Sequence, residues 1–386
     1  MHDTVSAAAD HVRSTIVSLR DLAAEHRTPG IVLTSPAAVA WATAGMNVPI
    51  DRSAGIDTVW VVVGPDRCVL LTTGVEAPRL AAEHDLGALG LELIAGPWWD
   101  ESELVTTAAA VSRAPADQLG SDGHAGFGVD LSTVLALARL TLDPWERQQL
   151  VALGRDASAA VQGALRHWRP GQSDREVAAR IAAAVELRGA QAPVLLVGGD
   201  DRLRRFRHPV AVGVPLVTTV MAVLVASRGG QHVALTRYAS AHEVDAELAA
   251  GLVTTRRIHR RVLAACLPGA TAGAVLDELA TAYADEGFPD AWQQHYQGGP
   301  IGYRQREFEI APHQTTSPWW TTRLAAGTAV AWNPSLPGGP KDEDTYLIDQ
   351  AGLPDQAGLT PVTVTPDWPM ADAELPARPG VLVVGE

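Results

Sequence analysis

The pattern of apolar residues changes at residue 143, and this change divides the chain into two parts. Up to about residue 130, short apolar runs separated by turn residues alternate with helical stretches. This alternation predicts strands interleaved with helices. Asp143 then offers a helix N-cap, and Pro144 follows it in the first turn. We therefore expect an α/β domain at residues 1–142 and a second domain at residues 143–386.

The second part carries the patterns of paired helices and antiparallel strands. A capping box at Ser173–Glu176 begins one helix, and the Gly229–Gly230 turn joins two strands in a hairpin. Two further helices are predicted at Val244–Cys266 and Ala272–Glu286. The last strands are predicted at Ile301–Ile310, Thr328–Trp332, Thr345–Ile348 and Leu359–Val364. The fold class is therefore α+β, with helix pairs packed on a curved antiparallel sheet.

Charge and composition restrict the partners of this chain. The 386 residues are 47% hydrophobic and 19% charged, as in a folded globular protein, and the net charge of -14 is unsuited to binding nucleic acid. The longest apolar stretch, Val214–Ala226, is too short for the roughly 20 residues of a membrane span. Two cysteines make no disulfide framework, and the acidic Met1–Arg27 does not resemble a signal peptide. We expect a cytoplasmic protein that binds a small molecule.

The densest cluster of polar residues lies between His295 and Glu307. The Gly298–Pro300 turn would let the backbone approach a ligand closely. His295 supplies an acid/base group, and Arg306 supplies a fork that binds carboxylates. A hairpin with an exposed polar turn is the alternative interpretation of the same residues.

Other motifs accompany this cluster in a fixed order along the chain. They are His208-Pro209, Ala234–Arg237, Ala331–Leu336 and Lys341–Thr345. Taken together, they resemble the creatinase and aminopeptidase P family of the pita-bread fold, which includes methionine aminopeptidase and prolidase. Leu33–Gly45 resembles the opening of that family's N-terminal domain, and residues 145–365 resemble its catalytic domain. The resemblance implies a C-terminal pita-bread domain, a smaller N-terminal α/β creatinase-like domain and a homodimer.

The resemblance also implies where metal ligands would stand. The family's peptidases hold two metal ions with two Asp, one His and two Glu side chains, which are hard ligands suited to activating water. In this chain the corresponding positions carry Val223, Ala234, His295, Asn333 and Glu343. One histidine and one carboxylate cannot hold a dinuclear centre. We therefore expect no metal and no other cofactor.

Creatinase shares this fold and works without metal, and its site residues can be compared one by one. Its acid/base histidine is resembled by His208. In creatinase, the Arg that binds the substrate carboxylate lies eleven residues after a site histidine, and a Glu follows it at twelve. In this chain Arg306 and Glu307 follow His295 at the same spacing. The resemblance therefore makes Arg306 the anchor of a substrate carboxylate.

The chain departs from creatinase at two carboxylates that hold the guanidinium group. Thr236 and Asn333 stand at these positions, so creatine is not the expected substrate. Their neutral hydrogen-bonding groups suit an amide, imine or hydroxylated group better than a cation.

We therefore predict a metal-independent, creatinase-like enzyme that acts on a small carboxylate-bearing substrate. The expected reaction is C–N bond hydrolysis, or a related lyase or isomerisation step in specialised metabolism. The expected catalytic residues are His208, His295, Glu343 and Glu307, and the expected substrate-binding residues are Arg306, Asn333, Tyr303, Thr236 and Arg237. Two alternatives stay open: a non-catalytic binding descendant of an Xaa-Pro aminopeptidase, and a metal-dependent Xaa-Pro peptidase.

Overall fold

The computed structural model describes residues 2–349 and 358–384. The chain forms two compact units, one comprising residues 1–139 with 229–231 and the other comprising residues 140–228 with 232–386. Among the described residues, no helix has the length and apolar character needed to cross a bilayer.

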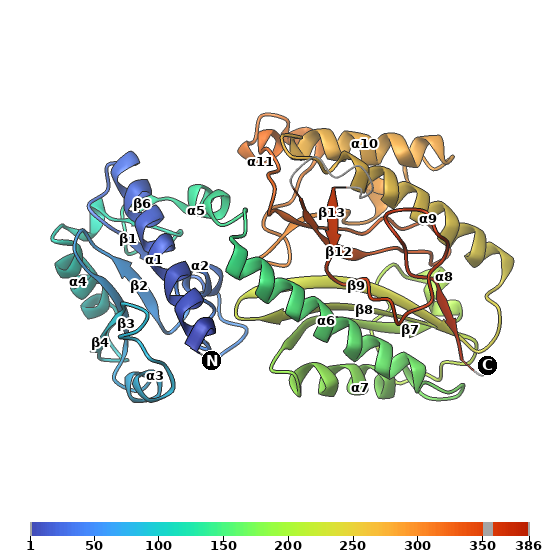
Figure 1. The fold of residues 1–386 in the computed structure, drawn as a ribbon, viewed down its shortest axis with the longest axis horizontal. Coiled ribbons are helices and arrows are strands. Elements are labelled where there is room, and N and C mark those ends of the chain that lie inside the picture. The colour runs from blue at the N-terminus through green and yellow to red at the C-terminus, as the bar shows by residue number, and fades with distance from the viewer. Residues whose placement is uncertain (1, 350–357, 385–386) are drawn as a thin grey trace. The chain divides into compact units, whose positions relative to one another are not determined.

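The first unit is built on a six-stranded sheet with the strand order β4-β3-β2-β1-β5-β6. Its strands are β1 (Ile31–Leu33), β2 (Trp60–Val63), β3 (Cys68–Thr73), β4 (Glu92–Gly96), β5 (Gly120–Ser121) and β6 (Val129–Asp130). Its helices are α1 (His2–Glu25), α2 (Pro36–Ala42), α3 (Ala77–Glu83), α4 (Glu101–Ser112), the short 3-10 helix η1 (Ala116–Gln118) and α5 (Ser132–Ala138). Helices α1 and α2 pack on one face of the sheet and α4 on the other (Figure 1). The predicted α/β alternation is confirmed for this unit.

The second unit is built on an eight-stranded sheet. Its main path runs β10-β11-β12-β9-β8-β7, with β13 paired to β12 and β14 to β9. The strands are β7 (Gln191–Gly199), β8 (Thr219–Arg228), β9 (Gln231–Ser240), β10 (Gly298–Ile301), β11 (Ala329–Trp332), β12 (Asp344–Ile348), β13 (Leu359–Pro361) and β14 (Val381–Val383). The β10–β11, β11–β12, β12–β9 and β7–β8 pairs are antiparallel, which agrees with the predicted α+β class.

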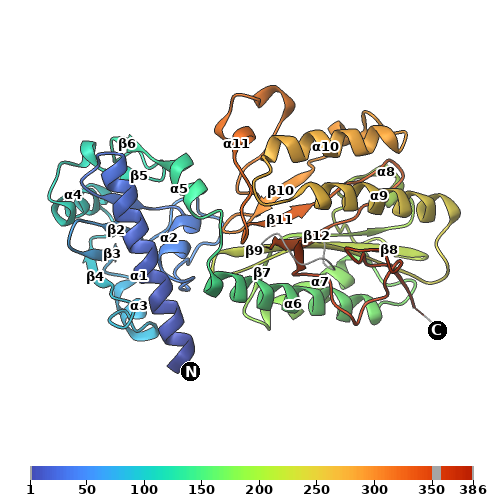
Figure 2. The ribbon, with the colours of Figure 1, turned by 45° about the horizontal axis from the view of Figure 1, so that its top comes forward.

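Two pairs of long helices cover this sheet (Figure 2). The helices of the unit are α6 (Pro144–Arg166), α7 (Asp174–Glu186), α8 (Asp201–Arg205), α9 (Ala246–Ala265), α10 (Ala272–Asp285) and α11 (Pro318–Thr321), with 3-10 helices η2 (Ala291–Gln294) and η3 (Pro312–Gln314). The predicted N-cap at Asp143 and the predicted capping box at Ser173 both form: the side chains of Asp143 and Ser173 accept from the third helical residue of α6 and α7, and the Asp143 cap is a full capping box as well. Helices α6 and α7 pack on β8 and β7.

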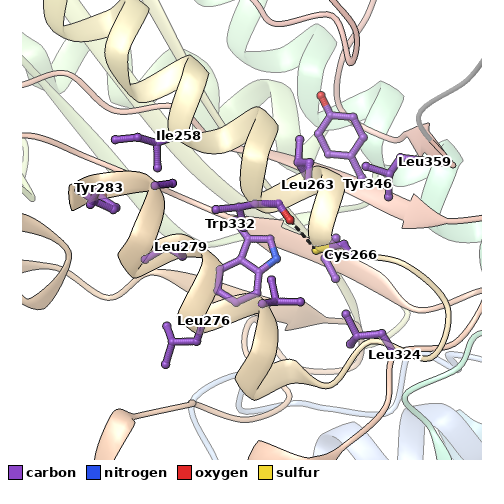
Figure 3. Close-up of a cluster of buried hydrophobic side chains, with 14 of the residues drawn as sticks. Ile258, Leu263, Cys266, Leu276, Leu279, Tyr283, Leu324, Trp332, Tyr346 and Leu359 are labelled. Atoms are coloured by element: carbon purple, nitrogen blue, oxygen red, sulfur yellow. Dashed lines mark hydrogen bonds between the residues drawn. The ribbon is translucent and has the colours of Figure 1, made fainter. Parts of the chain in front are cut away.

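Helices α9 and α10 enclose an apolar core with strands β11 and β12 (Figure 3). Trp332, Cys266 and Tyr283 lie in this core and are at most 1% exposed. Because β11 ends at Trp332, the same packing fixes the backbone from which Asn333 emerges.

The predicted strand Ile301–Ile310 is wrong. The strand runs earlier, from Gly298 to Ile301, and residues 302–309 form turns and bends. Gly298 makes this pairing possible, because it has φ +91° and a Cβ there would lie 2.1 Å from Ala331 O. The close approach that Gly298 permits is thus to β11.

Candidate functional site

A cavity of about 400 Å³ in the second unit is lined by four of the predicted site residues, His208, Arg306, Asn333 and Glu343. Strands β7 and β8 supply aliphatic side chains, and loops beside β8, β10, β11 and β12 supply polar ones. The lining residues are Val194, Leu196, His208, Val223, Val225, Tyr296, Gln305, Arg306, Glu309, Asn333, Lys341 and Glu343.

Two histidines meet at the edge of this cavity. The Nε2 atoms of His208 and His295 lie 3.0 Å apart, so one imidazole donates a hydrogen bond to the other. Burial lowers the pKa of His208, and the nearby Lys341 ammonium lowers it further. Burial and the same ammonium lower the pKa of His295 to about 2. The pair is therefore uncharged at neutral pH, as an imidazole that accepts a proton must be.

Carboxylates beneath the loop at residues 206–218 hold His208 in place. Asp174, which is fully buried, accepts from Val212 N at 3.0 Å and Gly213 N at 2.6 Å. Asp200 accepts from the backbone N–H groups of residues 217, 218 and 219. Four backbone hydrogen bonds thus tie the loop, and a fifth ties the first residue of β8, to Asp174 on α7 and to Asp200 just after β7, which restricts the position of His208.

Lys341 and Glu343 form an ion pair inside the cavity. The Lys341 Nζ lies 3.5 Å from Glu343 Oε2, and the two side chains are 4% and 2% exposed. Thr236 Oγ1 donates to the same carboxylate oxygen at 2.9 Å. Burial lowers the pKa of the Lys341 ammonium, and Glu343 opposes that change. Glu343 is therefore a buried carboxylate with an internal counterion.

A second ionic network lies beside this pair, on the alternate residues of the same segment. Asp342 accepts from Arg378 Nε at 2.7 Å and contacts His259 Nδ1 at 3.0 Å. Asp344 accepts from Arg378 Nη2 at 3.0 Å and Arg237 Nη2 at 2.8 Å. Since side chains alternate along an extended chain, this network holds residues 341–344 in register and presents Lys341 and Glu343 to the cavity.

Two lining side chains retain hydrogen-bonding capacity. Among the described residues, Arg306 donates one hydrogen bond, from Nη1 to Gln305 O, and its Nε lies 4.0 Å from the exposed Glu309. Asn333 is 4% exposed, and its Oδ1 has no hydrogen-bond partner in the described part of the chain. A guanidinium with open donors and an amide oxygen with an open acceptor position suit a ligand that bears a carboxylate and an N–H group.

Five predicted site residues are not part of the cavity lining, and one of them, His295, reaches it through its contact with His208. Tyr303 is buried and donates to Glu146 Oε1 at 2.9 Å, and Arg237 is bound to Asp344. Glu307 accepts from Arg304 N at 3.1 Å, which fixes the turn after β10. Thr236 reaches the site only through its hydrogen bond to Glu343.

Lys341 and the aliphatic side chains of Val194, Leu196 and Val225 were missed by the sequence analysis. One signal was available for Lys341, because residues 341 and 343 stand two apart before a predicted strand and so share a face. The resemblance placed Val223 at a ligand position of the family, but no comparable signal marks Val225, since every residue from Thr219 to Ser227 on β8 is buried.

The residues present do not fit a pair of metal ions. At the positions where the resemblance implies Asp ligands, Val223 is part of the apolar lining, and Ala234 is fully buried with its N–H donating to Thr345 Oγ1 at 2.8 Å. The remaining carboxylate, Glu343, faces the Lys341 ammonium. A cation beside the carboxylate opposes metal binding, which depends on ligand number and negative charge.

Comparison with known proteins rests on structure alone. No family model matches the sequence, and no curated protein is significantly similar to it. An Xaa-Pro dipeptidase from Bacillus anthracis superposes with a TM-score of 0.70 at 18% identity, over 92% of this chain and 98% of that chain. Dipeptidase PepE from Mycobacterium ulcerans gives a TM-score of 0.73 at 18% identity, over 97% and 99%. The chain has the pita-bread fold.

This pita-bread fold is shared with a protein of another kind. The N-terminal domain of FACT complex subunit SPT16 from chickpea, Cicer arietinum, superposes with a TM-score of 0.64 at 10% identity, over 93% of this chain and 96% of that domain. The fold therefore does not fix the function, which must be argued from the cavity.

Proposed function

We propose that the chain is a metal-independent, creatinase-like enzyme that hydrolyses a C–N bond in a small carboxylate-bearing substrate. The observation that carries this proposal is the uncharged His208–His295 pair in the same cavity as Glu343 and the open guanidinium of Arg306. An acid/base group, a carboxylate and a carboxylate anchor are the parts that such a hydrolysis needs.

The substrate is held at three points. Arg306 binds the substrate carboxylate through its free N–H donors. The scissile N–H group donates to Asn333 Oδ1, which otherwise lacks a partner among the described residues. The Lys341 ammonium donates to the oxygen that gains charge when the carbonyl carbon becomes tetrahedral.

The reaction balances with water as the second reactant. His208 accepts a proton from the water, with His295 and Glu343 orienting the reacting groups, and the water oxygen forms a bond to the carbonyl or amidine carbon. The C–N bond then breaks, and His208 returns the proton to the leaving nitrogen. The products are a free amine and an acid when the attacked carbon is a carbonyl, or a free amine and urea when it is an amidine, and neither step needs a metal-bound oxygen.

Substitution of His208 tests the proposal. The probe is a panel of N-acyl, N-carbamoyl and N-amidino amino acids, assayed by release of the free amine. His208→Ala should lower the rate about 10²- to 10⁴-fold. The exposed His242, on the loop after β9, gives the matched control, and His242→Ala should leave the rate unchanged. Equal rates in both variants would overturn the assignment of His208.

A second candidate is a protein that binds a ligand in this cavity without converting it. The changed residues at Val223, Ala234 and Asn333 support it, as does the likeness to a FACT complex subunit. Tight binding of a panel member with no turnover would favour this candidate. Turnover that is lost in Arg306→Ala would exclude it.

A further inference from the structure

One side of the cavity is a wall of aliphatic side chains from the antiparallel β7–β8 pair. Val194 lies opposite Val225, and Leu196 lies opposite Val223. Because residues two apart on a strand share a face, these four side chains stand together on one face of the sheet. All four line the cavity, so this wall offers a ligand only apolar contact.

The charged groups of the cavity come from segments other than β7 and β8. They differ in how closely a group of opposite charge lies beside them. Glu343 is already paired with Lys341 at 3.5 Å. Among the described residues, the ion-pair partner of Arg306 is the exposed Glu309, at 4.0 Å. A ligand carboxylate is therefore placed best at Arg306, and the remainder of a ligand that fills the cavity must lie against the aliphatic wall.

We infer that the substrate carries an aliphatic or aromatic group close to its carboxylate, as an N-acylated amino acid with an apolar side chain does. This inference rests on the proposed function, which supplies the carboxylate and the scissile C–N bond. The cavity of about 400 Å³ lies within the range of sites for small molecules. Each methylene buried against the wall should raise the affinity about fourfold.

Equilibrium binding of simple carboxylates tests the inference without requiring turnover. Acetate, butyrate and hexanoate are titrated into the full chain by calorimetry, with hexanamide as the uncharged control. The affinity should rise about fourfold per methylene from acetate to hexanoate, and hexanamide should bind more weakly than hexanoate. An affinity that is independent of chain length would overturn the inference.

Substitutions in the aliphatic wall test whether the dependence of affinity on chain length arises there. Val225→Thr keeps the shape of the side chain and replaces one methyl group by a hydroxyl, so hexanoate should bind about four- to tenfold more weakly while acetate is unaffected. The matched control is Val220→Thr, the same change on the opposite face of β8. Val194→Thr, at a partly buried position of β7, repeats the test if Val225→Thr does not fold. Equal effects of the wall and control variants would contradict the inference.

The outcome separates this inference from the proposed function. If hexanoate binding depends on chain length and on Val225 but no panel member is hydrolysed, the enzyme proposal fails and the apolar wall stands. If N-acylglycine is hydrolysed as efficiently as N-acylleucine or N-acylphenylalanine, the enzyme proposal stands and the apolar specificity is overturned.

Discussion

The Lys341 ammonium lies 3.5 Å from the Glu343 carboxylate, and both side chains are almost completely buried in the lining of one cavity. A buried carboxylate needs a compensating positive charge, since the cost of removing an isolated ion from water is several kcal/mol. In this chain the charge is supplied by a side chain two residues away.

Removal of that cation should destabilise the protein. Lys341→Met leaves Glu343 with the Thr236 hydroxyl but without a counterion, so the free energy of unfolding should fall by about 3–5 kcal/mol. Equilibrium urea unfolding measures the change. The double variant Lys341→Met/Glu343→Gln should recover most of the loss, and a double variant as unstable as the single one would contradict the pairing.

Arg378 should contribute as much to the stability of the protein as Lys341 does, although Arg378 lies outside the cavity lining. It binds both Asp342 and Asp344, and its side chain is fully buried, so Arg378→Met leaves two buried carboxylates without their shared cation. The expected loss is about 3–5 kcal/mol. Arg257→Met breaks an exposed ion pair with Glu286 and should cost at most about 1 kcal/mol. Similar losses in the two variants would refute a special role for the buried network.

The partly buried His295 predicts a loss of stability in mild acid. Its folded pKa is about 2, below the value of about 6.5 in an unfolded chain. Between these values the unfolded chain binds a proton that the folded chain excludes, so stability falls as the pH falls below about 6.5. The slope is up to about 1.4 kcal/mol per pH unit. Urea unfolding at pH 7.5, 6.5 and 5.5 should show a shallower dependence in His295→Gln than in the unsubstituted chain, and identical slopes would contradict this account.

The pH dependence of catalysis should follow His208. This imidazole must be uncharged to accept a proton, and burial together with Lys341 lowers its pKa below the ordinary value. The ratio kcat/KM should therefore be at its maximum at neutral pH and should decline only below about pH 6.5. A profile of kcat/KM between pH 5 and 8 checks this expectation. A decline with its midpoint above pH 6.5 would mean that His208 is not the base.

Local sequence signals were sufficient for most of the fold. The N-cap at Asp143, the capping box at Ser173 and the turn at Gly229–Gly230 are short-range patterns, and they form as predicted. The strand at Gly298–Ile301 was misplaced because its two glycines and proline resemble a turn, and only the pairing with β11 makes them a strand. The short strand β14, at Val381–Val383, was also missed, since its pairing partner β9 lies far away in the sequence.

The site was predicted only in part, for a similar reason. Tyr303 and Arg237 stand in polar motifs, but their partners Glu146 and Asp344 lie 157 and 107 residues away in the sequence. The alternation that turns Lys341 toward the cavity and Asp342 toward Arg378 depends on the segment being extended beside β9. Such partners become visible only when the chain is folded.

The central claim is that this cavity hydrolyses a C–N bond without a metal ion. The most direct test measures the turnover of the N-acyl, N-carbamoyl and N-amidino panel after exhaustive dialysis against EDTA, together with the metal content of the dialysed protein. The account predicts a rate unchanged within about twofold, no gain on adding Mn²⁺, Co²⁺ or Zn²⁺, and far less than one metal ion per chain. A rate that is abolished by EDTA and restored by one of these ions would contradict the account.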